Sequence, residues 1–330
     1  MNAVVHHGPG GFDSLDFRQM EEREPGPNEV KVRLRSAGLN HRDIWMLFRE
    51  REHEDPVILG SDGAGIVKAV GENVTNVAEG DKVVINPSLN WPRQSDAPPK
   101  NFEILGVPTA GTFAENIVIP AENVEKKPAH LNWEEAGVLP LAALTAYRAL
   151  FTRAKIQPGE HVLIPGIGSG VATYALQFAK AVGAKVTVTS RSKMKRNRAL
   201  ELGADHAIDS HGDWEEAMKG EKADVVIESI GPATFLKSLS QLRPGGRMVT
   251  YGATTGDEVT LPLREFFYGQ FNLLGTTMGS AEEFRAMLDF VCKQKIHPVI
   301  DKVYPLAEAA KGFLRMEEGE QFGKICFITE

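Results

Sequence analysis

The stretch HVLIPGIGSGVATYALQFAKAVGAKVTVTS, residues 161–190, indicates the fold class of this chain. An apolar run at 161–164 has the pattern of a buried strand, and Gly166, Gly168 and Gly170 follow it in a short loop. The next residues are apolar at helical spacing and lead to a second strand at 185–189. Glycines let a pyrophosphate approach the backbone N–H groups, and the helix N-terminus favours its negative charge. A strand, loop, helix and strand in this frame predict dinucleotide binding, although the loop has one residue more than a strict G-x-G-x-x-G.

The same alternation continues to about residue 280. Strands and helices that alternate along a chain form a parallel sheet with helices on both faces, so we expect a doubly wound α/β domain here. The further strands are expected at 206–208, 224–228, 247–251 and 272–277, and the further helices at 193–202, 214–219 and 233–242.

The first 120 residues have a different pattern. Short β-type runs separated by glycine and proline predict a small barrel or sandwich. The runs lie at 30–34, 65–70, 82–86 and 113–120. We expect two later helices, 281–293 and 307–317, and a last strand, 324–329, to return to this domain. The predicted domains are therefore 1–142 with 281–330, and 143–280 inserted between them.

Composition excludes several classes of partner. The 330 residues carry 37 Lys and Arg against 44 Asp and Glu, a net charge of −7, which disfavours nucleic acid and anionic membranes. No secretory signal or membrane span is visible. Cys292 and Cys326 fit no disulfide or metal spacing, so we expect a reduced, cytoplasmic protein.

Motifs along nearly the whole chain resemble the medium-chain dehydrogenase/reductase superfamily. They are AGLNHRD (37–43), PVILGSDGAGIVKAVGENV (56–74), GDKVVINP (80–87), GTFAEN (111–116), EEAGVLPLAALTAYRAL (134–150), LGAD (202–205), PGGRMVTYGA (244–253) and GKI (323–325). Within the superfamily, the chain is similar to the zinc-type alcohol dehydrogenase-like proteins and the quinone oxidoreductases. The resemblance implies a Rossmann domain inserted into a GroES-like β-barrel catalytic domain, with catalysis in the cleft between them.

The zinc ligands of that superfamily are missing. The resemblance places a cysteine ligand at Asn40, a His-Glu pair at Ser61-Asp62, and a second cysteine or histidine near Leu141. The lobe that holds structural zinc on four cysteines corresponds to 86–102, which contains none. Zinc requires Cys, His or carboxylate ligands, so the chain is expected to bind no metal; a weak site at Asp62 and His41 is the alternative.

Without a metal, hydrogen-bond donors must stabilise the oxygen of a carbonyl that accepts hydride. The resemblance places Asn40 near the nicotinamide ribose, with His41 and Asp43 on the same turn, and these three residues are the catalytic candidates. His41 has a proton to give near neutral pH. A surface position for His41 and a structural hydrogen bond for Asp43 are the alternatives. The tyrosine that zinc-free members often carry soon after the asparagine is absent from 44–55, which leaves water as another proton donor.

Further cofactor contacts follow from the resemblance and from the carboxyl ends of the predicted strands, where ligands bind in this architecture. A packing or turn role is the alternative for each. These candidates are Asn40, Thr145, Gly166, Gly168, Ser169, Gly170, Val171, Ser229, Tyr251, Gly252, Gly275, Thr276, Thr277 and Lys324. Aromatic residues Trp45, Phe48, Trp91 and Phe267 are expected either in the pocket wall or in the core.

The end of the second strand indicates which dinucleotide is used. An Asp or Glu at this position binds the ribose hydroxyl of NAD, but the chain reads Thr189-Ser190-Arg191-Ser192. Ser190 leaves room for a phosphate, and Arg191 and Lys195 supply positive charge. We therefore expect NADPH; a solvated basic face is the alternative.

The expected activity is NADPH-dependent reduction of a small carbonyl compound, enone or quinone, or the reverse oxidation of an alcohol. A dinucleotide-binding sensor or structural protein is the alternative, and RNA binding is a weaker third. Residues 266–271 lead into a strand expected at the sheet edge, which predicts a homodimer or homotetramer.

Overall fold

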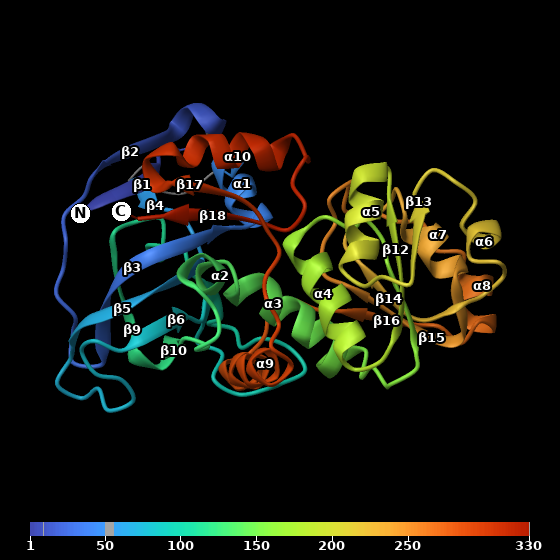
Figure 1. The fold of residues 1–330 in the computed structure, drawn as a ribbon, viewed down its shortest axis with the longest axis horizontal. Helices are drawn as coiled ribbons and strands as arrows, with labels where there is room; N and C mark the ends of the chain where they lie inside the picture. The colour runs from blue at the N-terminus through green and yellow to red at the C-terminus, as the bar shows by residue number, and fades with distance from the viewer. Residues whose placement is uncertain (9, 50–55, 330) are drawn as a thin grey trace. The chain divides into compact units, whose positions relative to one another are not determined.

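The computed structural model describes residues 1–8, 10–49 and 56–329, and the chain divides into two compact units (Figure 1). The first unit comprises Met1–Ala142 and Gly279–Glu330, and the second comprises Ala143–Met278.

The second unit contains a six-stranded parallel sheet in the order β13-β12-β11-β14-β15-β16. This is the strand order 3-2-1-4-5-6 of a doubly wound fold, so the predicted α/β class is confirmed. All four residues of the central strand β11 are buried, as expected for a strand with helices on both faces. The strands are β11 (His161–Ile164), β12 (Lys185–Ser190), β13 (His206–Asp209), β14 (Ala223–Glu228), β15 (Leu242–Thr250) and β16 (Asn272–Gly275).

Helices α4 and α5 lie on one side of this sheet, and α6, α7 and α8 lie on the other (Figure 1). Side chains of Ser169, Ser192 and Asp213 cap α4, α5 and α6 by accepting backbone N–H groups of the first turn. The helices are α3 (Pro140–Tyr147), a π-helical turn η3 (Arg148–Arg153), α4 (Gly170–Ala181), α5 (Lys193–Glu201), α6 (Trp214–Ala217), α7 (Phe235–Ser240) and α8 (Leu263–Tyr268).

The first unit is mainly β, as the sequence predicted. Its main sheet has the order β10-β6-β5-β3-β18-β17, and β9 also pairs with β3; the smaller sheets are β2-β1-β4 and β7-β8. The strands are β1 (Asn2–His6), β2 (Leu15–Gln19), β3 (Glu29–Leu39), β4 (Val57–Ile58), β5 (Asp62–Val70), β6 (Lys82–Ile85), β7 (Ser88–Leu89), β8 (Glu103–Ile104), β9 (Asn116–Pro120), β10 (Val124–Lys126), β17 (Ile300–Pro305) and β18 (Lys324–Ile328).

Strand β3 connects the parts of this unit, because it pairs with β5, β9 and β18. The last strand, β18, is antiparallel to β3, with Ile325 opposite Leu39, so the C-terminal segment lies beside the N-terminal motif around residue 40. Helices and helical turns complete the unit: η1 (Gly11–Ser14), α1 (His41–Phe48), η2 (Ala121–Asn123), α2 (Trp133–Gly137), α9 (Ala281–Gln294), η4 (Leu306–Glu308) and α10 (Ala309–Glu317).

Aromatic packing joins the two segments of the first unit. The ring of Phe113 lies edge-on to that of Phe327 at 5.1 Å and to that of Phe313 at 6.0 Å, and all three side chains are fully buried. A Cβ at Gly312 would lie 2.7 Å from the Phe327 ring, so α10 requires glycine there to approach β18. These contacts fix the C-terminal segment on the N-terminal strands.

Several elements differ from the expectation. The segment 263–268 is helix α8, whereas part of it was expected to lead directly into a strand; β16 itself is at the sheet edge, as predicted. Helix α1 and strands β1, β2 and β17 were not predicted. Of the stretch 44–55 that lacks a tyrosine, residues 50–55 lie outside the described residues.

Candidate functional site

The glycine loop of the second unit joins β11 to α4. Gly166 and Gly168 adopt φ values of +69° and +137°, which residues with a side chain rarely adopt. The N–H groups of Gly166 and Ile167 donate to the side chain and carbonyl of Thr189, at 3.2 and 2.8 Å, so the loop is attached to the end of β12. The next N–H groups, from Ser169 to Val171, begin helix α4, where an α-helix leaves N–H groups unpaired and attracts anions.

Three buried hydroxyls lie near the carboxyl ends of β15 and β16. Within the described part of the chain, Thr250 Oγ1, Tyr251 Oη and Thr276 Oγ1 make no hydrogen bond of normal geometry. Burial raises the pKa of Tyr251 to about 12, and the neighbouring hydroxyls of Ser229 and Ser169 act in the opposite direction. A buried polar group without a partner costs about 1–3 kcal/mol, so their position fits a ligand that supplies polar atoms. The loop and these hydroxyls together fit a dinucleotide.

The turn after β14 is built around a buried carboxylate that the sequence did not indicate. Glu228 Oε1 accepts from the Ile230 N–H at 2.7 Å and the Thr234 hydroxyl at 3.0 Å, and Oε2 accepts from the Ser238 hydroxyl at 2.6 Å. These bonds hold Ser229 at the strand end.

The remaining candidates of this unit are half-buried Gly252 after β15, the exposed Gly275 and Thr277 at and after β16, and Thr145, buried on α3.

The end of β12 carries basic side chains on a hydrogen-bonded turn. Ser190 is buried and its Oγ accepts from the Ser192 N–H at 3.2 Å; Arg191 is exposed, and Lys195 is half-buried in the first turn of α5. Arg196, which the sequence did not single out, holds this segment.

Nη1 of Arg196 donates to the carbonyls of Ser190 at 2.6 Å and Arg191 at 3.1 Å, and forms an ion pair with Asp209 at 2.8 Å. Asp209 lies opposite Ser190 in the pairing of β12 with β13, and because Arg196 compensates its charge, a phosphate beside Ser190 would meet less repulsion.

In the first unit, Lys324 is buried at the start of β18. Its Nζ atom donates to the Leu39 carbonyl at 2.8 Å, to Asn40 Oδ1 at 2.5 Å and to Asp62 Oδ2 at 2.9 Å. The amide of Asn40 donates to the same Asp62 oxygen at 2.9 Å, and the Leu141 N–H donates to Asp62 Oδ1 at 2.6 Å. The structure therefore places the Lys324 ammonium and the Asn40 amide in internal hydrogen bonds, and their contacts with a cofactor stay a prediction.

This network tests whether zinc fits. Asn40, Ser61 and Leu141 offer no thiolate or imidazole, and both Asp62 oxygens already accept hydrogen bonds. A fixed cation, the Lys324 ammonium, contacts two of the side chains that correspond to metal-ligand positions. Among the residues that the structure describes, no three His, Cys, Asp or Glu side chains are grouped to hold a metal ion. The donor set does not fit zinc.

Helix α1 positions the other catalytic candidates. Asp43 is fully buried and accepts from the Asn40 N–H at 2.8 Å; its burial raises the pKa to about 6, against the opposing effect of Arg42. The structure thus gives Asp43 a structural contact, the alternative expected of it. His41 keeps exposed surface but lies beside the Trp45 ring at 5.6 Å, and the partial loss of hydration lowers the pKa of its imidazole despite the nearby Glu317.

Arg42 lies between these two candidates and was missed. Its Nη1 atom donates to Ser61 Oγ at 2.9 Å and to the Leu105 carbonyl at 3.1 Å. The motif NHRD could have indicated a role for Arg42, because it places this cation among residues with expected catalytic roles.

Of the two positions expected for Trp91, pocket wall or core, the structure shows the core. Trp91 is buried, packs against Phe102 at 5.3 Å and donates to Ser95 Oγ at 2.9 Å, so it belongs to the core. Trp45 and Phe48 are exposed on α1, and Phe267 is exposed on α8 beside Tyr268 in the other unit.

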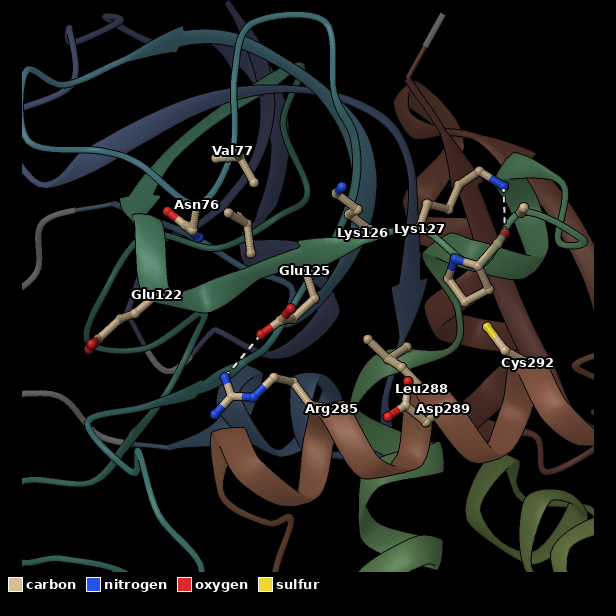
Figure 2. Close-up of a pocket in the computed structure, with 13 residues that line it drawn as sticks. Asn76, Val77, Glu122, Glu125, Lys126, Lys127, Arg285, Leu288, Asp289 and Cys292 are labelled. Carbon is tan, nitrogen blue, oxygen red and sulfur yellow. Dashed lines mark hydrogen bonds and ion pairs between the residues drawn. The ribbon is translucent and has the colours of Figure 1, made fainter.

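A hollow of about 680 Å³ lies between β10 and α9 in the first unit (Figure 2). Arg285 on α9 crosses it to Glu125 on β10 at 3.0 Å, while the ammonium of Lys127 donates to the Pro128 carbonyl at 3.1 Å. The half-buried Cys292 lines one end, and burial raises the pKa of its thiol. Three carboxylates and three cations balance in the lining, and none of the predicted site residues is among them.

No helix within the described ranges has the length and apolarity needed to cross a bilayer.

Two family models match the chain. Residues 26–129 match the alcohol dehydrogenase GroES-like domain, and residues 170–293 match the zinc-binding dehydrogenase family.

Relatives match over the whole length. A zinc-type alcohol dehydrogenase-like protein of Schizosaccharomyces pombe is 36% identical over 98% of this chain and 97% of its own. An acryloyl-coenzyme A reductase of Metallosphaera sedula is 30% identical over 100% of both chains. The crystal structure of an NAD-dependent alcohol dehydrogenase superposes with a TM-score of 0.94 at 39% identity, covering 100% of both chains.

Proposed function

The chain belongs to the medium-chain dehydrogenase/reductase superfamily, and from this premise we propose that it is a zinc-independent, NADPH-dependent oxidoreductase. Its substrates in this proposal are small carbonyl compounds, enones or quinones, or the corresponding alcohols in reverse. The acryloyl-coenzyme A reductase among the relatives is named for the reduction of an unsaturated thioester, a compound of the enone type.

One observation supports metal independence above all others: the Lys324 ammonium lies 2.5 Å from Asn40 Oδ1 and 2.9 Å from Asp62 Oδ2. A second cation among these atoms would meet repulsion in a buried site where charge is weakly screened. The name of the matching family therefore describes a property that these residues do not support.

The end of β12 supports NADPH as the cofactor. Ser190 Oγ accepts from Ser192, which leaves its O–H to donate to a phosphate oxygen, and Arg191 is exposed beside it. Asp209, the carboxylate nearby, is paired with Arg196. The similar alcohol dehydrogenase of known structure is NAD-dependent, but that dependence is a property of that protein, and the specificity proposed for this chain follows from its own residues.

The dinucleotide, when bound, supplies or accepts the hydride. The residues of this chain would bind and orient it: the first turn of α4 would hold the pyrophosphate, and the hydroxyls of Tyr251 and Thr276 would donate to its polar groups. In this proposal, the proton that completes reduction comes from water or from exposed His41, since Asp43 is buried.

We also propose a homodimer or homotetramer that forms through the sheet edge at β16. Apolar side chains are exposed on and beside this edge, and an exposed edge strand usually pairs with another chain or is covered. They are Leu263, Phe267, Tyr268 and Leu273.

Both cysteines carry free thiols, which fits the cytoplasmic location that we propose.

The experiment that tests the function is oxidation of NADPH, followed by absorbance, against a panel of aldehydes, ketones, enones and quinones. The proposal expects turnover with at least one class. A protein that binds NADPH without oxidising it in the presence of any member would be a sensor or structural protein.

A further inference from the structure

We infer that the guanidinium of Arg42 hydrogen-bonds the substrate oxygen on which negative charge develops, in place of the metal ion of zinc-dependent relatives. This inference rests on the proposed function and identifies a residue with direct contact to the substrate. It commits the chain to substrates whose reduction produces an oxyanion, either an alkoxide from a carbonyl or an enolate from an enone.

Within the described part of the chain, the guanidinium of Arg42 is held through Nη1. Nη1 donates to Ser61 Oγ at 2.9 Å and to the Leu105 carbonyl at 3.1 Å, while Ser61 Oγ in turn donates to the same carbonyl at 2.6 Å. Among the described residues, neither Nε nor Nη2 of Arg42 makes a hydrogen bond, although a guanidinium has five N–H donors. The two hydrogen bonds of Nη1 fix the orientation of the guanidinium, and the N–H groups on Nε and Nη2 can donate to a ligand.

The charge of Arg42 is also incompletely compensated. Its hydrogen-bond acceptors are neutral, and the Asp43 carboxylate is 3.7 Å away and already accepts from the Asn40 N–H. Burial and the nearby Arg49 lower the pKa of Arg42, while Asp43 and Asp62 oppose this. The side chain remains 16% exposed, so a ligand can reach a cation that is otherwise largely removed from water. A hydrogen bond from such a donor is stronger than one in bulk water.

The neighbouring groups do not offer this combination. Lys324 is only 3% exposed and its three hydrogen bonds to Leu39, Asn40 and Asp62 use all its donors. The Asn40 amide donates to Asp62. Among the described residues of this cluster, Arg42 is therefore the cation that has both accessible surface and N–H groups without a hydrogen bond.

The chemical step balances without a metal. The reduced dinucleotide, when bound, would supply the hydride: its C–H bond would break as a C–H bond forms at the carbonyl carbon, or at the β-carbon of an enone, and the π electrons would move to oxygen. The dinucleotide is oxidised and the substrate is reduced by two electrons. Arg42 donates a hydrogen bond to the oxyanion and keeps its own proton. The proton that completes the product then comes from His41 or from water, which leaves hydroxide to the solvent.

The test compares Arg42→Ala and Arg42→Lys in the full-length protein with Arg33→Ala, a matched control whose arginine is exposed on β3. The measurements are kcat and KM for the best carbonyl of the panel, the Kd for NADPH by fluorescence, and the melting temperature. We expect Arg42→Ala to lower kcat about a hundredfold, the effect of losing one oxyanion donor. The Kd for NADPH should stay unchanged, Arg42→Lys should retain part of the activity, and Arg33→Ala should match the wild type.

Chemical rescue separates a direct role from a structural one. Added guanidinium or methylguanidinium at millimolar concentration should restore part of the kcat of Arg42→Ala in a saturable manner, with no effect on Arg33→Ala. A wild-type kcat in Arg42→Ala, or a loss of kcat with a lowered melting temperature and no rescue, would overturn the inference alone. A wild type inactive toward the whole panel overturns the proposed function and this inference with it.

Discussion

The ammonium of Lys324 lies 2.9 Å from Oδ2 of Asp62, and the two side chains are 3% and 0% exposed. This ion pair joins the last strand of the first unit to β5, and the amide of Asn40 completes it. It gives the buried Asp62 side chain a cationic partner from within the chain.

The first prediction concerns this pair. Lys324→Met leaves the Asp62 carboxylate buried and unpaired, so the free energy of unfolding should fall by about 3–5 kcal/mol. Adding Asp62→Asn removes the orphaned charge and should recover a large part of that loss. Urea unfolding of the single and double variants measures both values. Lys311→Met, at an exposed lysine of the same unit, is the control. Wild-type stability of Lys324→Met would show that the pair is not charged.

The second prediction concerns the pH dependence of stability through Asp43. Its pKa in the folded protein, about 6, is above the usual 3.8, because burial disfavours the charged form. The folded state therefore holds the proton more tightly, and the stabilising contribution is complete below pH 3.8 and lost as pH rises through about 6. The amide of Asp43→Asn does not ionise, so the stability of this variant relative to the wild type should rise over this range by about 3 kcal/mol at most.

Unfolding of the wild type and of Asp43→Asn by urea at pH 4.5 and pH 7.5 checks this prediction. Asp16→Asn, at an exposed position on β2, is the matched control and should show no such change with pH. A relative stability of Asp43→Asn that stays constant or falls between the two pH values would mean that Asp43 is charged and compensated in the folded protein.

The fold was predictable because its signals are local. Strand β11 has the bounds expected from its apolar run, and the glycines at 166 and 168 have the backbone angles that a tight turn next to a ligand requires. The spacing of the apolar residues and the turn residues also predicted the bounds of α5 and β18 to within one residue. Helix α1 was missed because its eight residues are too few for a clear apolar period, and its strongest signal was the pair Asn40 and Asp43.

The candidate site was less predictable because its residues are distant in the sequence. Lys324 and Asp62 are 262 residues apart, and no local pattern indicates that β18 brings them together. Likewise, Arg196 could be counted as a surface charge until its bonds to the carbonyls of Ser190 and Arg191 were visible. The sequence could indicate that the expected zinc ligands are replaced, but not that the Lys324 ammonium contacts Asn40 and Asp62.

The third prediction concerns cofactor specificity. We expect the wild type to prefer NADPH over NADH by at least about tenfold in kcat/KM, since a charge-assisted hydrogen bond is worth about 1.5–3 kcal/mol. Arg191→Ala should lose most of this preference with nearly unchanged NADH kinetics, and Ser190→Asp should invert it by repelling the 2′-phosphate. Arg264→Ala, at an exposed arginine on α8, is the control for charge alone. Equal use of NADH and NADPH by the wild type would mean that Arg191 and Lys195 are a solvated face.

The fourth prediction concerns assembly. Light scattering at micromolar concentration should give a multiple of the 36.1 kDa monomer mass. Leu273→Lys, on the edge strand β16, should shift the mass toward the monomer because it places a charge among exposed apolar side chains. Leu314→Lys is a matched control at an exposed leucine of the other unit. A monomeric wild type would contradict the proposed interface.

The central claim is hydride transfer without a metal, and one measurement tests it most directly. Protein dialysed against a strong chelator is analysed for zinc and assayed for NADPH oxidation with the responsive member of the carbonyl, enone and quinone panel. We predict well under one zinc per chain before dialysis and the same kcat before and after it. One tightly bound zinc per chain, whose removal abolishes turnover and whose return restores it, would contradict the account.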